Sequence, residues 1–556
     1  MTQNQDWWRG AVIYQIYPRS FQDSNDDGIG DLRGITARLD HVARLGADAI
    51  WLSPINRSPM ADMGYDVSDY YDVDPLFGTL ADFDTLIARA HELGLKVIID
   101  QVLNHSSDRH PWFADSRKRG AKADWYVWAD PKPDGSPPNN WQSNFGGSSW
   151  EWAPERGQYY LHNFLISQPD LNLRNPEVQD EVLRILRFWL DRGVDGFRLD
   201  TANSYIHDAL LRDNPPAKPD PKRWPPVSTF DMQDHDHDKS QPETVDFLKR
   251  IRALTNEYEG RCLLAEIGDV PERALRLMAD YTAGNDRLHM AYSFDMLGPE
   301  FTPAHFRKII EGFFVAAPDG WPSWSFSNHD VNRHVTRWIG HGPQDAVAKL
   351  AISMLASFQG TIGLYQGEEL GQTETELLYE ELTDPPGLRF WPENKGRDGC
   401  RTPMVWDGSE NGGFSAGRPW LPVKPPQVAR NVAAQEADPG SVLSHYRKVM
   451  AFRRGSPALR SGRTEWLEVP ETVLAFRRVQ GTEALSCFFN LGSEPVTIVA
   501  PKGEMSGPSI GAVMAGFEMT LAPLAAVWLR DAPDVVEESG WSLGRALAKV
   551  KRLMGG

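Results

Sequence analysis

The stretch Asp195-Gly196-Phe197-Arg198-Leu199-Asp200-Thr201-Ala202 decides the fold of this chain. It leads from a turn through a short apolar strand to a carboxylate. A buried strand that ends in Arg-x-Asp carries a charge pair to the carboxyl end of a sheet, where parallel α/β folds place their reactive groups. The stretch therefore predicts an active site at the carboxyl edge of a parallel sheet.

Three further segments repeat this pattern of an apolar strand followed by reactive side chains. Residues 96–100 lead into Gln-Val-Leu-Asn-His at 101–105, residues 261–266 close on Glu266, and residues 324–330 close on Asn-His-Asp. One charged strand end is common, but four in chain order indicate a shared site, because the carboxyl ends of parallel strands meet at one face.

Strand-like and helix-like segments alternate along most of the chain. Eight strands with helices between them predict a (β/α)8 barrel, the TIM barrel of the α/β class. The strand candidates are residues 11–17, 49–52, 96–100, 194–200, 261–266, 290–294, 324–327 and 361–365.

Two departures from this alternation predict further domains. The connection after the third strand is far longer than an ordinary loop and rich in Trp, Gly and Pro, which predicts an inserted irregular subdomain. After about residue 460 the apolar residues recur with a period of two, which predicts a C-terminal antiparallel β-domain. We assign residues 1–104 and 174–460 to the barrel, 105–173 to the insert, 461–530 to the β-domain and 531–556 to a tail.

Composition limits the class of protein and of partner. A chain of 556 residues with 41% hydrophobic content can form several domains and a large core. Its net charge of -18 argues against nucleic acid or an anionic membrane as partner, because both are negatively charged. Three scattered cysteines exclude a disulfide framework, and neither a secretory signal nor a spanning segment is visible. These features predict a cytoplasmic protein.

Taken together, the motifs resemble glycoside hydrolase family 13, the α-amylase family, and within it the α-glucosidase and oligo-1,6-glucosidase group. The family motifs correspond to residues 100–105, 196–200, Glu266 and 328–330, and Gln-Pro-Asp-Leu-Asn at 168–172 is typical of that group. The resemblance covers about residues 7–530. It implies an exo-acting, retaining α-glucosidase that releases glucose from the nonreducing end of short oligosaccharides.

By this resemblance, three carboxylates carry the reaction. Asp200 would be the nucleophile, kept ionised by the neighbouring Arg198, and Glu266 would be the acid and then the base. The acid role requires a raised pKa for Glu266, while Asp330 would stabilise the oxocarbenium-like state. Retention requires the first two carboxyl groups to lie roughly 5 to 5.5 Å apart.

The resemblance also implies which residues bind the glucose ring. Two histidines of the motifs would hydrogen-bond it, Tyr65 would stack on it, and Asp62 with Arg401 would close the pocket and enforce release from the chain end. Arg397 is a near alternative to Arg401, which we prefer by motif position. The expected substrate-binding residues are Asp62, Tyr65, His105, Arg198, Thr201, His329 and Arg401.

Thr201 directly follows the expected nucleophile and therefore lies near the bond to be cleaved. In the group that this chain resembles, valine at this position accompanies a preference for α-1,6 linkages, whereas threonine or alanine accompanies α-1,4. The resemblance thus predicts that maltose is preferred over isomaltose.

An acidic loop at residues 23–31 alternates oxygen-bearing side chains around a glycine turn, a pattern that suits a hard cation such as Ca²⁺. Family relatives bind a metal there, so we expect a structural calcium ion and no organic cofactor; a solvated acidic turn is the alternative. The run His-Asp-His-Asp at 235–238 also looks metal-like, but its polar surroundings favour a solvated loop. The expected calcium ligands are Asp23, Asn25, Asp27, Ile29 and Asp31.

Several activities share this set of residues. We favour an α-glucosidase that also transfers glucose to a sugar or alcohol acceptor, because water and alcohols can compete for a covalent intermediate. The alternatives are a glucosyltransferase, a sucrose- or trehalose-active enzyme, an oligo-1,6-glucosidase, and a noncatalytic barrel scaffold, which would lack the carboxylates. The long connection at 204–243 follows the fourth strand and predicts a lid over the leaving-group side.

Overall fold

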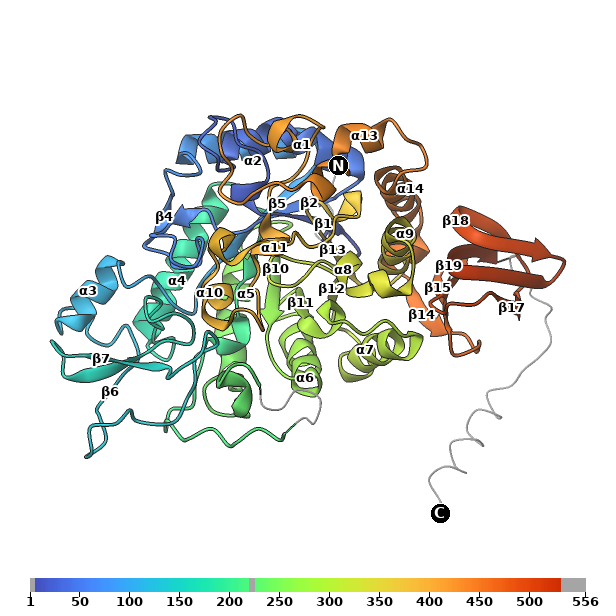
Figure 1. The fold of residues 1–556 in the computed structure, drawn as a ribbon. Helices are drawn as coiled ribbons and strands as arrows, with labels where there is room; N and C mark the ends of the chain where they lie inside the picture. Colours follow the sequence, from blue (N-terminus) through green and yellow to red (C-terminus); the bar gives the residue numbers. More distant parts are fainter. Residues whose placement is uncertain (1–5, 220–225, 532–556) are drawn as a thin grey trace, which may run out of the picture.

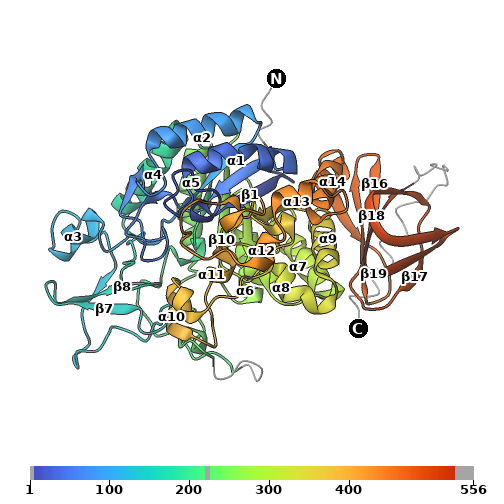
Figure 2. The same ribbon diagram turned by 45° about the horizontal axis from the view of Figure 1, so that its top comes forward.

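The computed structural model describes residues 6–219 and 226–531, so the predicted tail beyond Asp531 lies outside the described residues. The eight predicted strands form one parallel sheet in the order β11-β10-β9-β5-β2-β1-β13-β12 (Figures 1 and 2). A parallel bridge between Ala291 and Pro322 joins the two edge strands and closes the ring. The strands are β1 (Val12–Ile16), β2 (Ala49–Leu52), β5 (Lys96–Gln101), β9 (Gly196–Leu199), β10 (Cys262–Ile267), β11 (Met290–Ser293), β12 (Ser323–Ser325) and β13 (Thr361–Tyr365).

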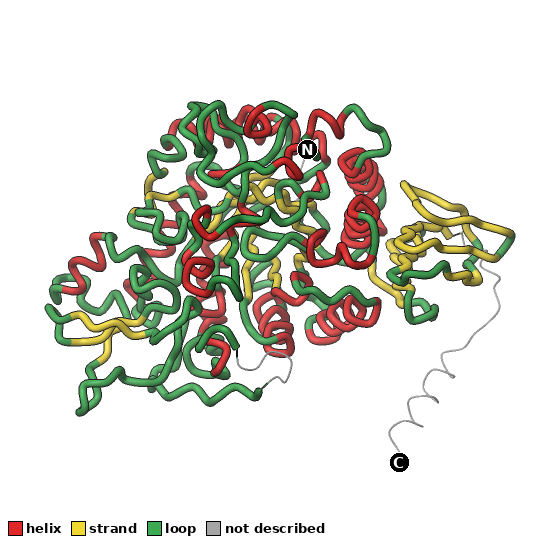
Figure 3. Tube along the Cα trace, in the orientation of Figure 1, coloured by secondary structure: helices red, strands yellow, loops and turns green. Residues whose placement is uncertain are grey.

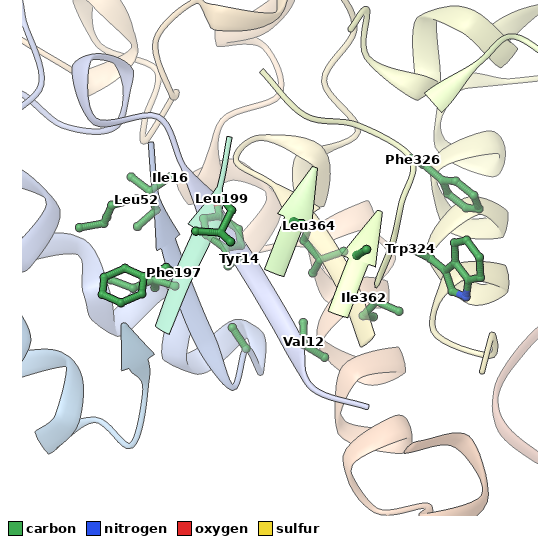
Figure 4. Packing of buried hydrophobic residues seen from close by; sticks show 14 of the residues in the cluster. Val12, Tyr14, Ile16, Leu52, Phe197, Leu199, Trp324, Phe326, Ile362 and Leu364 are labelled. Atoms are coloured by element: carbon green, nitrogen blue, oxygen red, sulfur yellow. The ribbon is translucent and has the colours of Figure 1, made fainter. Parts of the chain in front are cut away.

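The strands alternate their side chains between the barrel interior and the layer beneath the helices. On β9, Phe197 and Leu199 belong to the large apolar core between sheet and helices (Figure 4). Because successive side chains of a strand point to opposite faces, Arg198 between them points into the barrel. The register places Arg198 beside Asp100 of β5, and the same alternation turns Glu266 of β10 inward. The fold thus brings these charged groups together.

Helices surround the sheet, and their ends have clear chemical causes. The carboxylate of Asp31 caps α1 by accepting a hydrogen bond from the Gly34 N–H, and Gly46 ends that helix at a φ of 102°. Thr79 and Asp82 form a capping box at the start of α2. The helices around the barrel are α1 (Leu32–Leu45), α2 (Leu80–Glu92), α4 (Pro176–Asp191), α5 (Thr244–Thr255), α6 (Pro271–Thr282), α7 (Pro303–Ala316), α8 (His334–Trp338), α9 (Gln344–Leu355) and α14 (Val442–Arg454).

The inserted segment after β5 forms a small sheet of its own, in the order β6-β8-β7, with one helix beside it. Trp141 and Trp150 are buried in its apolar cluster, so they are structural. A two-stranded hairpin, β3 (Asn56–Arg57) with β4 (Asp69–Val73), follows β2. The elements of the insert are α3 (Pro111–Arg117), β6 (Trp128–Ala129), β7 (Trp150–Ala153) and β8 (Gln158–Leu161).

Long connections that are mostly loop carry the chain over the catalytic face (Figure 3). Short helices interrupt the connection between β13 and α14. No helix in the described ranges is long and apolar enough to cross a membrane. The short helices are α10 (Pro385–Phe390), α11 (Asp398–Arg401), α12 (Pro425–Val428) and α13 (Val432–Glu436), and α15 (Pro457–Ser461) follows α14.

The C-terminal strands form the predicted antiparallel domain, in the order β14-β15-β16-β19-β17, with β18 also paired to β19. The sequence pattern did not predict β18, because glycines interrupt its alternation; Gly507 and Gly511 have φ values of 61° and 72°, and the pairing shifts register there. The strands are β14 (Arg463–Trp466), β15 (Val473–Gln480), β16 (Glu483–Asn490), β17 (Val496–Val499), β18 (Gly503–Ala515) and β19 (Glu518–Asp531).

Candidate active site

A cavity of about 750 Å³ opens at the carboxyl ends of the barrel strands. Its walls come from the loops after β2, β5, β9, β10 and β12, from the insert, and from the segment that precedes α11. A polar, concave site at this end of a barrel is where enzymes of this fold bind their substrates. The predicted residues that line it are Asp62, Tyr65, His105, Asp200, Thr201, Glu266 and Asp330.

Arg198 lies at the base of this cavity and joins its carboxylates. Its Nη1 donates to Asp200 Oδ1 at 2.6 Å and to Asp100 Oδ1 at 2.9 Å, and its Nη2 contacts Glu266. The Tyr292 hydroxyl accepts from Nε and Nη2. Arg198 is fully buried and does not line the cavity, so it contacts the carboxylates from beneath.

The environment of Asp200 differs from the predicted one. Burial raises the pKa of this carboxyl to about 7, while Arg198 opposes the rise and the carboxylates of Asp100 and Asp330 reinforce it. We predicted that Arg198 would keep Asp200 ionised. The arginine does favour the ionised form, but the loss of solvation outweighs it, because desolvation penalises the charged state.

The surroundings of Asp330 favour its ionised form, in contrast to those of Asp200. Arg401 Nη2 donates to its Oδ1 at 2.9 Å, and Arg397 Nη1 donates to the same oxygen at 3.1 Å. Burial opposes ionisation of Asp330, but the positive charges of Arg397 and Arg401 outweigh it and hold the pKa below its usual value. The cavity therefore contains one carboxylate that is held ionised and one whose protonation changes near neutral pH.

Arg397, and not Arg401, reaches the cavity wall. Arg397 Nη2 donates to Asp62 Oδ1 at 2.9 Å and to Asp384 Oδ1 at 2.6 Å. Arg401 is fully buried on α11, where it holds Asp330 and the His329 carbonyl from behind. We preferred Arg401 as the substrate-binding arginine, but the structure places Arg397, the near alternative, at the cavity wall and Arg401 behind Asp330. Which of the two binds the substrate stays a prediction.

Tyr65 lines the cavity with its ring backed by His329, the two rings being stacked at 5.3 Å and 7°. Gln15 Nε2 lies 2.7 Å from His329 Nδ1, and the Tyr65 hydroxyl lies 2.5 Å from His329 Nε2 while donating to Asp100 Oδ2 at 3.1 Å. These contacts fit a neutral ring protonated at Nε2, and burial lowers the pKa of His329 well below its usual value. His329 therefore supports Tyr65 and does not line the cavity.

His105 does line the cavity and is held on several sides. Its Nε2 lies 3.0 Å from the Tyr65 carbonyl and 3.2 Å from Gln168 Nε2, and burial lowers the pKa of this imidazole to about 4. Gln168, the first residue of the Gln-Pro-Asp-Leu-Asn motif, also donates to Asp62 Oδ2 at 3.0 Å. Gln168 of this motif thus orients two side chains of the pocket, those of His105 and Asp62.

Thr201 adopts a left-handed conformation, with φ 40° and ψ 45°. This region is unfavourable for a β-branched residue, and such strain is concentrated at functional sites. The Thr201 hydroxyl lies 3.5 Å from Asp200 Oδ2 and faces the cavity. The conformation places the side chain next to the carboxylate, as predicted from the order of the two residues.

The described parts of the connection at 204–243, residues 204–219 and 226–243, contribute to the cavity wall and are fastened to the insert. Trp141 Nε1 donates to the carbonyl of Arg212 at 2.9 Å, and Thr229 Oγ1 donates to Gln142 Oε1 at 2.8 Å. Phe230 of this connection lines the cavity. The predicted lid is therefore one wall of the site, continuous with the insert.

The run at 235–238 is not a solvated loop. His235 and Asp238 are both buried, with His235 Nδ1 2.5 Å from Asp238 Oδ2. His235 also stacks on Phe230, with ring centroids 3.7 Å apart. Sequence composition suggested exposure, but the aromatic neighbour five positions earlier buries the pair.

The acidic loop at 23–31 is closed by its own hydrogen bonds. Asp23 accepts from three backbone N–H groups, Asn25 and Asp27 accept from one each, and Asp31 caps α1. Ile29, the expected carbonyl ligand, is tied to Asp27 through its N–H. Within residues 6–219 and 226–531, no three acidic, histidine or cysteine side chains gather to hold a metal ion. The expected ligand set also includes the Asn25 amide and the Ile29 carbonyl, and calcium binding stays a prediction.

Sequence reasoning missed the aromatic residues of the cavity wall. We expected most of the six tryptophans of the insert to be structural and one or two to stack on the sugar; all six are described, and none belongs to the wall. Phe145 and Phe164 of the insert line it instead, and the Arg397 guanidinium lies 5.3 Å from the Phe145 ring. No periodic signal marks them, because they lie in irregular loops.

Comparison with known proteins agrees with this geometry. Residues 15–462 match the family described as "Alpha amylase, catalytic domain". A "Probable alpha-glucosidase" of Rhizobium meliloti (strain 1021) is 57% identical over 505 residues, 90% of this chain and 92% of the relative. An "Oligo-1,6-glucosidase" of Parageobacillus thermoglucosidasius is 38% identical over 530 residues, 88% of this chain and 91% of the relative.

A solved structure extends the similarity to the whole fold. The α-glucosyl transfer enzyme XgtA superposes with a TM-score of 0.91 at 50% identity, over 95% of this chain and 99% of that chain. The family match spans most of the sequence, and the motif carboxylates meet in one cavity. The chain therefore belongs to the α-amylase family, glycoside hydrolase family 13.

Proposed function

We propose that this protein is an exo-acting, retaining α-glucosidase that releases α-glucose from the nonreducing end of short oligosaccharides. One observation carries the proposal: Asp200 and Glu266, at the ends of the adjacent strands β9 and β10, both contact the Arg198 guanidinium and both line the cavity. We take these two carboxyl groups, which share one guanidinium, to be the pair that retention requires at a short separation. Relatives named α-glucosidase support the same activity.

In this proposal Asp200 attacks the anomeric carbon, and Glu266 donates a proton to the departing oxygen. Glu266 then takes a proton from the incoming water, which attacks the glucosyl group and restores the α configuration. Asp330, held ionised by its arginines, faces the ring where positive charge develops and stabilises it.

The chain-end preference follows from the ion pair between Asp62 and Arg397. Both side chains line the cavity, and Arg397 also contacts Asp384 and Asp330, which ties the pair into a network. A glucose hydroxyl can bind to this network, but a further sugar unit would have to break it. The network therefore limits attack to the terminal glucose.

We propose that α-1,4 linkages are preferred, because Thr201 presents a hydroxyl beside Asp200. A site with a polar group there favours a leaving group that can bond to it, and a mismatch leaves that group unpaired. The second candidate is α-1,6 specificity, which the name of the Parageobacillus relative favours.

Glucose transfer is part of the proposal. The glucosyl intermediate reacts with an alcohol by the same chemistry as with water, and the similarity to XgtA, named as a glucosyl transfer enzyme, supports it. We further propose a cytoplasmic location, which the three unpaired, buried cysteines support, because such compartments keep thiols reduced.

Two measurements test the proposal. A panel of maltose, isomaltose, sucrose and trehalose, with products followed by chromatography and NMR, should show glucose released first as the α anomer, and fastest from maltose. A fluorinated glucoside should label Asp200, detected by peptide mass spectrometry. A β-anomeric first product or a label on another residue would reject the mechanism, and activity confined to sucrose or trehalose would replace the substrate. No activity on any of the four would favour a noncatalytic scaffold.

A further inference from the structure

We propose that Phe230 is the binding platform for the leaving group of the substrate, and that His235 and Asp238 position its ring; the inference rests on the proposed glucosidase function. Phe230 lies in a short 3-10 helix, Phe230–Met232, within the connection at 204–243. Neither motif nor periodicity singles it out, and the reaction described above does not use it.

The location of Phe230 points to the leaving group. The glucose end of the cavity is defined by Asp62 and Arg397, and the bond to be cleaved must lie at Asp200 and Glu266. The remainder of the substrate extends beyond these carboxylates, away from the ion pair. There the cavity joins an outer cleft of about 1720 Å³, and Phe230 lines both spaces.

The ring of Phe230 is held in place by a polar pair beneath it. His235 stacks on it at 3.7 Å with an interplanar angle of 22°, and His235 Nε2 lies 3.0 Å from the Phe230 carbonyl. Asp238, which is 1% exposed, binds His235 Nδ1 at 2.5 Å. The imidazole is therefore fixed at both nitrogens, and one face of the phenyl ring is covered.

The ammonium group of Lys239 also contacts the Phe230 ring. Lys239 Nζ lies 5.2 Å from the centroid of the Phe230 ring and donates to the Gly268 carbonyl at 2.9 Å. Gly268 follows β10 and also lines both spaces. The platform is thus attached to the loop that follows Glu266, so its position is linked to the site of bond cleavage.

The Phe230 ring can make an apolar contact that the carboxylates cannot make. An aromatic ring presents an apolar face to the C–H groups of a sugar or to an aryl group, at little cost in side-chain entropy. Such a contact acts on any leaving group or acceptor large enough to reach it. It therefore governs both the donor disaccharide and the acceptor of glucose transfer.

The experiment compares substrates with and without a leaving group of that size. Phe230→Ala and Phe230→Leu should raise the KM for maltose and maltotriose by about ten-fold, which a single apolar contact supports. The kcat/KM for α-glucosyl fluoride should stay unchanged, because fluoride is too small to reach the ring. Met232→Ala is the matched control, since Met232 is exposed in the same short helix and belongs to neither wall.

The positioning role of His235 has its own readout. His235→Gln keeps a hydrogen-bonding side chain without a ring. Introduced into the wild-type enzyme it should raise the KM for maltose, whereas introduced into the Phe230→Ala variant it should leave that KM unchanged. Non-additivity of this kind shows that His235 acts through Phe230. Additive effects would overturn the positioning role.

The outcomes separate the two proposals. Wild-type enzyme that does not hydrolyse α-glucosyl fluoride would reject the glucosidase function itself. An active wild type with equal losses on maltose and glucosyl fluoride in Phe230→Leu, whose apolar side chain preserves the packing, would show that Phe230 is only structural. Unchanged maltose kinetics in both Phe230 variants would place the leaving group elsewhere.

Discussion

Arg397 Nη2 lies 2.9 Å from Asp62 Oδ1, so two residues 335 positions apart close one end of the cavity. Asp62 comes from the loop after β2 and Arg397 from the segment that leads into α11. Burial raises the pKa of Asp62, while Arg397 and Arg401 oppose the rise. Asp62 thus depends on the neighbouring arginines to remain ionised.

Removal of this arginine should weaken glucose binding. Arg397→Ala removes a charged hydrogen-bond donor worth about 1.5 to 3 kcal/mol, which predicts a KM for maltose higher by about ten- to 150-fold. Arg401→Ala should lower kcat more than it raises KM, because Arg401 touches Asp330 and not the cavity. Steady-state kinetics separate the two, with Arg184→Ala on the exposed face of α4 as the surface control, and equal KM effects in both arginine variants would contradict the assignment.

Glu266→Gln should distinguish leaving groups by their basicity. A disaccharide needs a proton on its departing oxygen, so its kcat/KM should fall by about 10² to 10⁴. A nitrophenyl glucoside leaves readily as an anion and should lose far less. Asp200→Asn, by contrast, should abolish turnover of both substrates. Comparable losses on both substrates in Glu266→Gln would count against its role as the acid.

Activity should fall on the acid side with an apparent pKa near 7. Burial raises the pKa of Asp200 to about 7, and only the ionised carboxylate can attack. As the pH falls below this value the protonated fraction grows, so kcat/KM should drop about tenfold per pH unit. A pH profile with a nitrophenyl glucoside measures the free enzyme. An acid limb near pH 4 would show that Arg198 outweighs burial after all.

Thr201→Val should shift the linkage preference. Valine has nearly the shape of threonine but lacks the hydroxyl, so the change isolates one polar contact of about 1 to 3 kcal/mol. We expect the wild type to prefer maltose and the variant to lose part of that preference relative to isomaltose. The ratio of the two kcat/KM values is the measurement, and a wild type that prefers isomaltose would reject the α-1,4 proposal.

The calcium prediction can be tested by stability. A bound ion at a hundred times its Kd adds about 2.7 kcal/mol, so EDTA should lower the Tm of the wild type while kcat of the folded enzyme is retained. Asp27→Ala should remove this response, because it removes one of the expected calcium ligands. Asp27 is exposed and accepts one backbone hydrogen bond in the loop, so the substitution should leave the fold intact. A Tm that EDTA leaves unchanged would identify the loop as a self-bonded turn.

The barrel strands were predictable because each is an apolar run that ends in a polar group. The alternation of Phe197, Arg198 and Leu199 already determines which side chains point inward. The choice between Arg397 and Arg401 was not predictable, because the two lie four positions apart and only the start of α11 decides which one reaches the cavity. Phe230 was likewise hidden, since it lies in an irregular connection where no periodic pattern marks its packing against His235.

The hydrogen bonds between the insert and the connection at 204–243 restrict how such enzymes can be recombined. Trp141 donates to the Arg212 carbonyl, and the Asn140 amide donates to the Asn214 carbonyl at 2.8 Å. A chimaera that receives a connection with a different backbone path from a relative would displace these carbonyl acceptors and leave the buried Trp141 N–H unpaired. To transfer specificity between relatives with this scaffold, segments 139–142 and 204–243 must therefore be exchanged together.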